Sequence, residues 1–129
     1  MIQTSRIAVL VSSPEEGRSK QLLDTFLEAL KLNDCTFINP RKRDELQALK
    51  GKRVFFLLGE QVVKACFRKM PGKLSEIEGK IYWDRKHDIY CIPLALPSSW
   101  IRHRKQRIKV FKKLIPRLMH SLQVILSQN

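Results

Sequence analysis

Two unbroken apolar runs constrain the fold of this chain more than any other feature. Residues 7–11 read Ile-Ala-Val-Leu-Val, and residues 53–58 read Arg-Val-Phe-Phe-Leu-Leu, so that after Arg53 neither run alternates with polar residues. A strand with one face in water alternates apolar and polar residues, whereas a strand covered on both faces stays apolar throughout. Both runs therefore predict strands inside a parallel sheet that has helices on each face.

Helices and shorter strands alternate along the rest of the chain. Apolar residues spaced by three or four predict an amphipathic helix over residues 20–32 and a long last helix over residues 108–125. A hairpin with arms at 77–83 and 89–92 is expected to lead into the fourth strand. The other expected elements are a strand at 35–38 and helices near 44–49 and at 60–68. This order predicts one α/β domain over residues 1–129, a three-layer sandwich around a mostly parallel four-stranded sheet.

The C-terminal segment that contains the last helix carries most of the net charge. The chain has 25 Lys and Arg against 12 Asp and Glu, a formal net charge of +13. Residues 99–129 contain no acid, and their basic residues are Arg102, Arg104, Lys105, Arg107, Lys109, Lys112, Lys113 and Arg117. A second cluster, Arg41, Lys42 and Arg43, follows the strand at 35–38. Nucleic acid is the commonest polyanion that binds such a domain, while a plain solvated face and an acidic protein partner are alternatives.

Loops that follow parallel strands meet at one edge of a sheet, where ligands bind in open α/β folds. The loops at 12–18, 39–43, 59–60 and 94–102 are expected to lie there, and both basic clusters fall in or beside them. The last loop also holds Ser98, Ser99 and Trp100. We expect Trp100 to be at least partly exposed and to stack on bases or wedge between them.

No pattern in the sequence indicates a cofactor, a metal or a membrane. The cysteines and histidines are Cys35, Cys66, Cys91, His87, His103 and His120. The cysteines lie far apart in apolar stretches, which predicts three buried, reduced thiols, and the histidines lack metal-binding spacing. No apolar run approaches the roughly 18 residues needed to cross a bilayer, and the first residues do not form a signal peptide. A cytoplasmic protein associated with DNA is therefore expected.

Four segments in chain order carry a family pattern. They are residues 11–30, beginning Val-Ser-Ser-Pro-Glu-Glu-Gly-Arg-Ser-Lys-Gln-Leu-Leu-Asp, residues 37–43 (Phe-Ile-Asn-Pro-Arg-Lys-Arg), residues 57–62 (Leu-Leu-Gly-Glu-Gln-Val) and residues 96–102 (Leu-Pro-Ser-Ser-Trp-Ile-Arg). In order and in strand-to-loop context, these segments resemble the uracil-DNA glycosylase superfamily, particularly its thermophilic, iron–sulfur-containing branch. The resemblance implies a DNA-docking fold in which Asn39 reads a base edge and the last loop carries a hydrophobic wedge.

The chain departs from this family at the positions that carry its chemistry. Ser12 or Ser13 stands where the family has the acidic or Asn residue that positions water, and Leu96 replaces the His that stabilises the departing base. The cluster cysteines have no equivalents. Loss of the oxyanion donor alone raises a barrier by roughly 2.7–4 kcal/mol. Asn39 has a second interpretation, because Asn-Pro at a strand end is also an ordinary turn.

The sequence therefore predicts a sequence-independent DNA-binding protein without glycosylase activity, acting as an accessory in replication or repair. Its DNA, single-stranded or damaged, would contact Asn39, Arg41, Lys42, Arg43, Ser98, Ser99, Trp100, Arg102, Arg104 and Lys105. The alternatives are an active glycosylase with a rearranged site and a protein-interaction module that joins a replication or repair partner, such as a polymerase-associated subunit.

Overall fold

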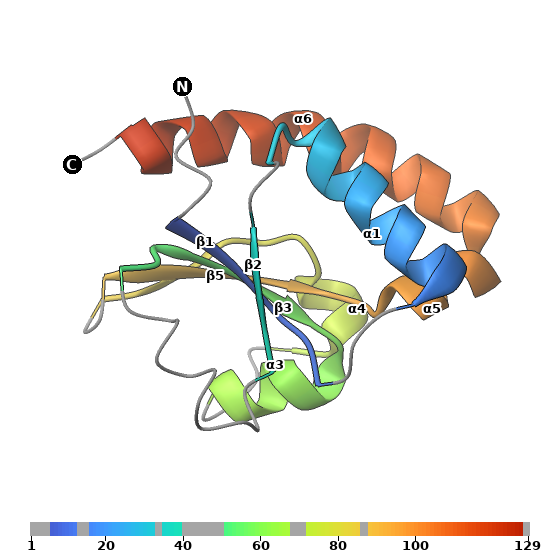
Figure 1. Ribbon diagram of the computed structural model, residues 1–129, viewed down its shortest axis with the longest axis horizontal. Coiled ribbons are helices and arrows are strands. Elements are labelled where there is room, and N and C mark those ends of the chain that lie inside the picture. Colours follow the sequence, from blue (N-terminus) through green and yellow to red (C-terminus); the bar gives the residue numbers. More distant parts are fainter. Residues whose placement is uncertain are drawn as a thin grey trace.

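The computed structural model describes residues 6–12, 16–32, 35–39, 51–67, 72–85 and 88–127 (Figure 1). The elements in chain order are β1 (Ile7–Leu10), α1 (Gly17–Ala29), β2 (Thr36–Ile38), β3 (Val54–Leu58), α3 (Glu60–Cys66), α4 (Leu74–Ile77), β4 (Tyr82–Asp84), β5 (Ile89–Leu94), α5 (Pro97–Arg102) and α6 (Arg104–Ser127). Arg41, Lys42, Arg43, Ser13 and the helix expected near 44–49 lie outside the described residues. No helix in the described part of the chain combines the length and the apolar character that crossing a membrane requires.

The sheet is mostly parallel, as predicted, but it has five strands among the described residues instead of four. Its order is β2-β1-β3-β5-β4. Strands β2, β1, β3 and β5 run parallel, and β4 pairs antiparallel with β5 through Tyr82 opposite Cys91 and Asp84 opposite Ile89. The predicted hairpin exists, but its first arm, expected at 77–83, is only Tyr82–Asp84, because Ile77 belongs to α4. Both arms join the sheet, and β5 is itself the fourth parallel strand. The expected count was therefore one strand too low.

Helices cover both faces of the sheet, so the predicted α/β layering is confirmed (Figure 1). Alternate residues of the central strands face opposite layers: Val9 and Phe56 pack with α1, α5 and α6, whereas Leu10 and Leu57 pack with α3 and α4. All four side chains are at most 2% exposed. Burial on both faces explains why the residues of β1 and β3 are apolar throughout.

The segment after β5 is helical where a loop was expected. Helix α5 begins at Pro97, and the main-chain N–H of Ser99 donates to the carbonyl of Leu96 over 2.8 Å. Proline suits the first helical position because its φ is already helical and its missing N–H would have no partner there. The expected loop at 94–102 therefore contains a short helix that begins seven residues before α6.

Pro116 lies inside α6, which continues through it from Arg104 to Ser127. A proline at this position removes the hydrogen bond to the carbonyl of Lys112 and costs roughly 3 kcal/mol in a helix interior. Both Pro116 and Lys112 are exposed. Water can therefore bond to the released carbonyl, which explains how the helix tolerates the proline.

Helix α6 is fixed to the sheet by the carboxylate of Glu78, in the turn after α4. One carboxylate oxygen accepts the N–H of Ala95 over 2.7 Å, and the other forms an ion pair with the Arg107 guanidinium. The two side chains of the ion pair are only 9% and 16% exposed. Next to Glu78, Gly79 lies so close to Leu114 that a Cβ there would approach its Cδ1 to 2.4 Å. A polar and an apolar contact, about two helical turns apart, thus position the first half of α6.

We expect Glu78→Gln to destabilise the protein by about 3 kcal/mol, because Arg107 would stay in a nearly buried position without a compensating charge. Urea denaturation measures this change in the free energy of unfolding. The double variant Glu78→Gln, Arg107→Met should recover part of the loss, since it leaves no unpaired charge. Equal destabilisation by the single and the double variant would show that the ion pair does not fix α6.

Candidate nucleic-acid interface

The carboxyl ends of the four parallel strands lie at one edge of the sheet, as the sequence predicted. The N–H of Val11, after β1, donates to the carbonyl of Ile38 at the end of β2 over 2.9 Å. The N–H of Gly59, after β3, donates to the carbonyl of Leu94 at the end of β5 over 2.8 Å. These bonds hold the described parts of the expected loops in fixed positions.

Asn39 connects the first two of these loops. Its side-chain Nδ2 donates to the main-chain oxygen of Ser12 over 3.2 Å, and both residues are half-buried. This bond gives Asn39 a structural role at the strand end, in line with the turn interpretation. Strand order separates β2 from β5 by three strand spacings, about 14 Å. Asn39 is therefore not adjacent to Ser98 and Ser99, and those expected DNA-contacting residues that the structure describes do not form one compact site.

Leu96 fills the position at which the resembling family has a histidine. Its side chain is half-buried against the core and lies over Gly59, where a Cβ would approach the Leu96 Cγ to 2.9 Å. Gly59 has a φ of 91°, a left-handed conformation that glycine adopts without strain. An apolar contact thus covers the β3-to-α3 turn. Neither Leu96 nor Ser12 offers a group that titrates near neutral pH.

The expectation that Trp100 is exposed is wrong. Trp100 is 2% exposed, and its ring lies 5.4 Å from that of Phe26 in α1 and 5.0 Å from that of Phe111 in α6. The rings of Phe26 and Phe111 are 5.2 Å apart, so three aromatic side chains join three helices. Trp100 lies one turn into α5, on the side packed against α1, while Ser98 and Arg102 are exposed. Polar neighbours in the sequence therefore did not predict that Trp100 is buried, because they lie on other sides of the same helix.

The other DNA-contacting residues that were predicted after β5 lie on α5 and at the start of α6. Arg102, Arg104, Lys105 and Ser98 are exposed, and Ser99 is half-buried. They lie within residues 98–105, on two successive helices after the carboxyl end of β5. Asn39 lies apart from them, at the end of β2.

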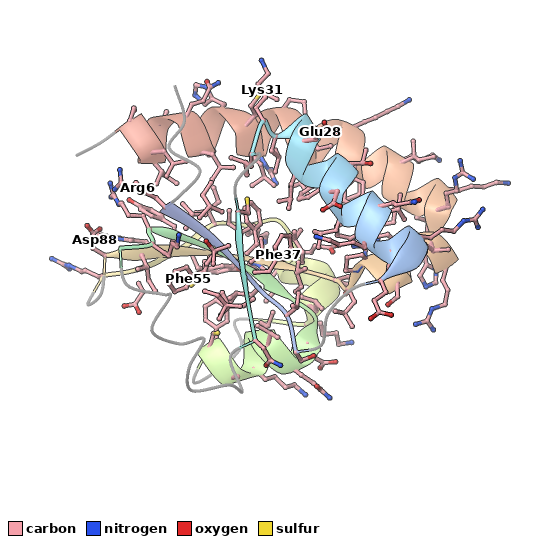
Figure 2. The ribbon with its side chains drawn as sticks, in the orientation of Figure 1. Arg6, Glu28, Lys31, Phe37, Phe55 and Asp88 are labelled. Atoms are coloured by element: carbon pink, nitrogen blue, oxygen red, sulfur yellow. The ribbon has the colours of Figure 1, made fainter. Side chains whose placement is uncertain are left out.

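Four further cations follow these residues along α6 and were not among the predicted site residues. We define the basic strip as Lys105, Lys109, Lys112, Lys113 and Arg117, all of which are exposed. At ~100° per residue these side chains lie on the side of α6 opposite its buried residues. The i, i+4 spacing in the sequence was the signal that would have found them. Many side chains that end in nitrogen project from α1 and α6 away from the sheet (Figure 2).

No member of the basic strip forms an ion pair with an acidic residue of the described chain. Arg107 is the exception among the basic residues of α6, because its charge is matched by Glu78. Two exposed acidic residues elsewhere are paired with a lysine on their own helix, Asp24 with Lys20 over 3.0 Å and Glu60 with Lys64 over 3.1 Å. The charge of the strip is therefore open to an external anion.

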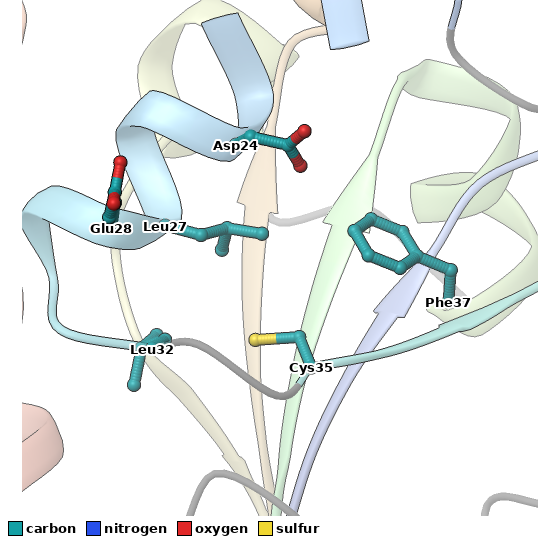
Figure 3. Close-up of a pocket in the computed structure, with 6 residues that line it drawn as sticks. All are labelled: Asp24, Leu27, Glu28, Leu32, Cys35 and Phe37. Atoms are coloured by element: carbon teal, nitrogen blue, oxygen red, sulfur yellow. The ribbon is translucent and has the colours of Figure 1, made fainter. Parts of the chain in front are cut away.

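A small pocket of about 240 Å³ lies between α1 and β2 and carries the opposite charge (Figure 3). Its lining residues are Asp24, Leu27, Glu28, Leu32, Cys35 and Phe37. Lys20 pairs with Asp24 and also lies 3.8 Å from the centre of the Phe37 ring. The lining contains two carboxylates and no cation, so this pocket offers no group that would bind a phosphate.

The prediction of three buried thiols is wrong for two of them, since Cys35 is half-buried and Cys66 is exposed. Only Cys91 is buried, and burial raises the pKa of its thiol to about 12, so it stays protonated at neutral pH. All three cysteines are free of disulfides. Within the described residues no group of three or more His, Cys, Asp and Glu side chains is placed to bind a metal.

We expect Trp100→Ala to destabilise the protein by roughly 3–5 kcal/mol, the usual cost of removing a buried aromatic side chain. The indole Nε1 of Trp100 is buried and has no hydrogen-bond partner among the described residues. Trp100→Phe should therefore cost much less, because it keeps an aromatic ring and removes an unsatisfied donor worth about 1–3 kcal/mol. Thermal and urea denaturation measure both. Equal losses in the two variants would show that the indole nitrogen is satisfied.

The described residues thus give an edge of the sheet held by main-chain hydrogen bonds, a basic helix beside it, and an apolar Leu96 in place of a titratable side chain. Such an arrangement can bind polyanions. It offers no paired acid and base at the described strand ends. A scan against models of known protein families gives no match to this chain, and a search of curated proteins gives none either.

Proposed function

We propose that this protein binds DNA independently of sequence, through the basic strip of α6 together with Arg102 and Arg104. The observation that carries the proposal is a line of exposed cations, none of which is paired with an acidic residue of the described chain. Lys and Arg side chains that contact phosphates release counterions and bind without reading bases. Proposed partners are therefore single- or double-stranded DNA of any sequence.

The spacing of the basic strip suits a phosphate backbone. From Lys105 to Arg117 the helix rises about 18 Å, and duplex DNA of that length carries roughly ten phosphates. Each of the five cations can thus find a phosphate without an exact register. Contacts of this kind position a protein on DNA but do not distinguish sequences.

A plain solvated face explains this charge pattern less well. Three neighbouring pairs at i, i+4 carry like charges (Lys105 and Lys109, Lys109 and Lys113, Lys113 and Arg117), which together destabilise the helix by roughly 1 kcal/mol. The first turn of α6 contains no acidic residue, and Arg104 and Lys105 stand at the positive end of the helix dipole, where cations are unfavourable. A helix selected only for stability would carry acids at these positions. A bound polyanion removes both penalties.

The proposal includes a relationship to the uracil-DNA glycosylase superfamily in which docking is retained and base excision is lost. It is supported by the four segments in order, by their places at the carboxyl ends of parallel strands, and by the apolar Leu96 over Gly59. On this proposal the protein is an accessory of DNA replication or repair. Asn39 would support the loop through Ser12 and would not read a base.

Binding to DNA should weaken steeply with salt and should not depend on sequence. We expect log K to fall linearly with log salt, with a slope of about −0.9 per duplex phosphate contact and −0.7 per single-strand contact. The triple variant Lys105→Gln, Lys109→Gln, Lys112→Gln should reduce the magnitude of the slope by about 2–3 and weaken binding to every sequence alike. Fluorescence anisotropy with labelled oligonucleotides measures both effects.

The matched control removes three exposed cations elsewhere, in Lys73→Gln, Lys80→Gln, Arg85→Gln. This variant has the same net charge as the strip variant and should keep most of the DNA affinity. If the two variants lost affinity equally, net charge alone would account for binding. A salt titration without slope would contradict DNA binding altogether.

Uracil excision should be absent or barely above background. The reason is chemical, because the positions of the family's water-positioning group and oxyanion donor hold Ser12 or Ser13 and Leu96. Alkali-labile sites in uracil-containing single- and double-stranded oligonucleotides provide the assay. Robust cleavage that disappears in Asn39→Ala or Ser12→Ala would instead support an active glycosylase with a rearranged site.

A further inference from the structure

A groove of about 490 Å³ lies between α1 and the α5–α6 pair, on a different side of α6 from the basic strip. We call it the α1–α6 groove. Its lining residues are Arg18, Gln21, Leu22, Thr25, Trp100, Ile101, Arg104, Arg107, Ile108 and Phe111. None of them belongs to the basic strip. Arg104 belongs to the groove and to the proposed DNA contacts, but the other lining residues can be altered without changing the basic strip.

The floor of the α1–α6 groove is apolar and open to water. Leu22 is 39% exposed, Ile101 is 38% exposed and Ile108 is 48% exposed. Trp100 and Phe111, whose rings contact each other and Phe26, also line the groove. Covering an aliphatic side chain stabilises a complex by roughly 25 cal/mol for each Å² of apolar surface removed from water. Three such side chains facing one groove form a surface that a partner could cover.

The rim of the groove is positive. Arg18 in α1 and Arg104 in α6 are exposed, and neither forms an ion pair within the described chain. Arg107 also lines the groove, but its charge is matched by Glu78. No Asp or Glu lines the groove. An occupant therefore gains from carrying acidic groups at its edges.

Apolar floor and positive rim together select one class of occupant. DNA brings phosphates for the arginines but no aliphatic surface for Leu22, Ile101 and Ile108. A second copy of this chain would bring Arg18 and Arg104 against their counterparts, and its net charge of +13 would repel the first copy. A groove between two helices accepts the apolar face of a third helix, whose anchors recur at i, i+3 or i+4, and i+7.

We propose that the α1–α6 groove binds an acidic amphipathic helix of a partner protein. Its apolar side chains would cover Leu22, Ile101 and Ile108, and its flanking carboxylates would pair with Arg18 and Arg104. This proposal does not depend on the proposed DNA binding, because Arg104 is the one residue that the two proposals share and the apolar anchors belong to the groove alone. It assigns to the protein a second surface, for a protein ligand.

The probe is a fluorescein-labelled peptide of about four helical turns, with leucines along one face and glutamates on the others. Its control is a peptide of the same composition with the leucines distributed around the helix. The amphipathic peptide should bind at least about tenfold more tightly than the control, a difference of about 1.4 kcal/mol. Fluorescence anisotropy measures the affinities. Equal binding of the two peptides would overturn the proposal, since charge alone would then explain the interaction.

Variants locate the binding surface. Ile101→Ser, Ile108→Ser should weaken the amphipathic peptide about tenfold while leaving the melting temperature nearly unchanged, because both side chains are exposed. A double variant of the strip, Lys109→Gln, Lys113→Gln, has lost two charges but should bind the peptide within about threefold of the unmodified protein. Trp100 emission in a Trp83→Phe background should shift on binding, because Trp100 lies in the groove lining.

DNA affinity separates this proposal from the proposed function. The groove variant should bind DNA as the unmodified protein does, whether that binding is strong or absent. A loss of DNA binding in the groove variant would overturn the proposal and make the groove part of a nucleic-acid site. Self-association that the same two substitutions abolish, measured by sedimentation, would overturn it in favour of a second copy.

Discussion

The carboxylate of Glu78 fixes the helix on which both proposed surfaces depend. It accepts the N–H of Ala95, which directly follows β5, and it pairs with Arg107 near the start of α6. One side chain therefore sets the end of a central strand relative to the most basic helix. Leu114, packed on Gly79 two turns farther along, prevents the helix from rotating about this ion pair. Without these contacts, neither the basic strip nor the α1–α6 groove would keep a fixed shape.

The geometry of α6 explains how one helix can present two surfaces. Leu114, Leu118 and Leu122 occupy the side toward the sheet, and at ~100° per residue Lys109 lies on the opposite side. Arg104 and Ile108 also point toward this inner side, because they precede the buried Leu122 and Leu126 by 18 residues, or five full turns. They belong to the first turns, however, where α1 is the neighbour across the groove. The sheet thus covers the second half of the inner face of α6, and the first half is left to form a groove wall.

The sequence predicted the parts of this fold that depend on local burial and missed those that depend on distant neighbours. The runs in β1 and β3 were recognisable because burial on both faces requires every residue to be apolar. The hairpin of β4 with β5 was predicted, but β4 was not counted in the sheet, because its place there depends on β5 pairing with β3, which no local pattern contains. Trp100 was misjudged for the same reason, since Phe26 and Phe111 are not its sequence neighbours. The groove escaped notice because its walls, α1 and α6, are far apart in the chain.

Two anionic ligands bound to α6 would repel each other, and the distance between their contacts along the helix would limit this repulsion. Arg104 at the groove and Lys105 on the strip are consecutive residues, so a peptide carboxylate and a DNA phosphate bound there would lie close enough to repel. Repulsion between exposed charges fades beyond a Debye length of about 8 Å at physiological salt. Arg117 lies about 18 Å along the helix from Lys105, so repulsion from the peptide would not weaken a phosphate contact at Arg117. An acidic helix in the groove would therefore weaken DNA binding at the first turn of α6 and leave the rest of the strip engaged, an antagonism that rising salt would remove.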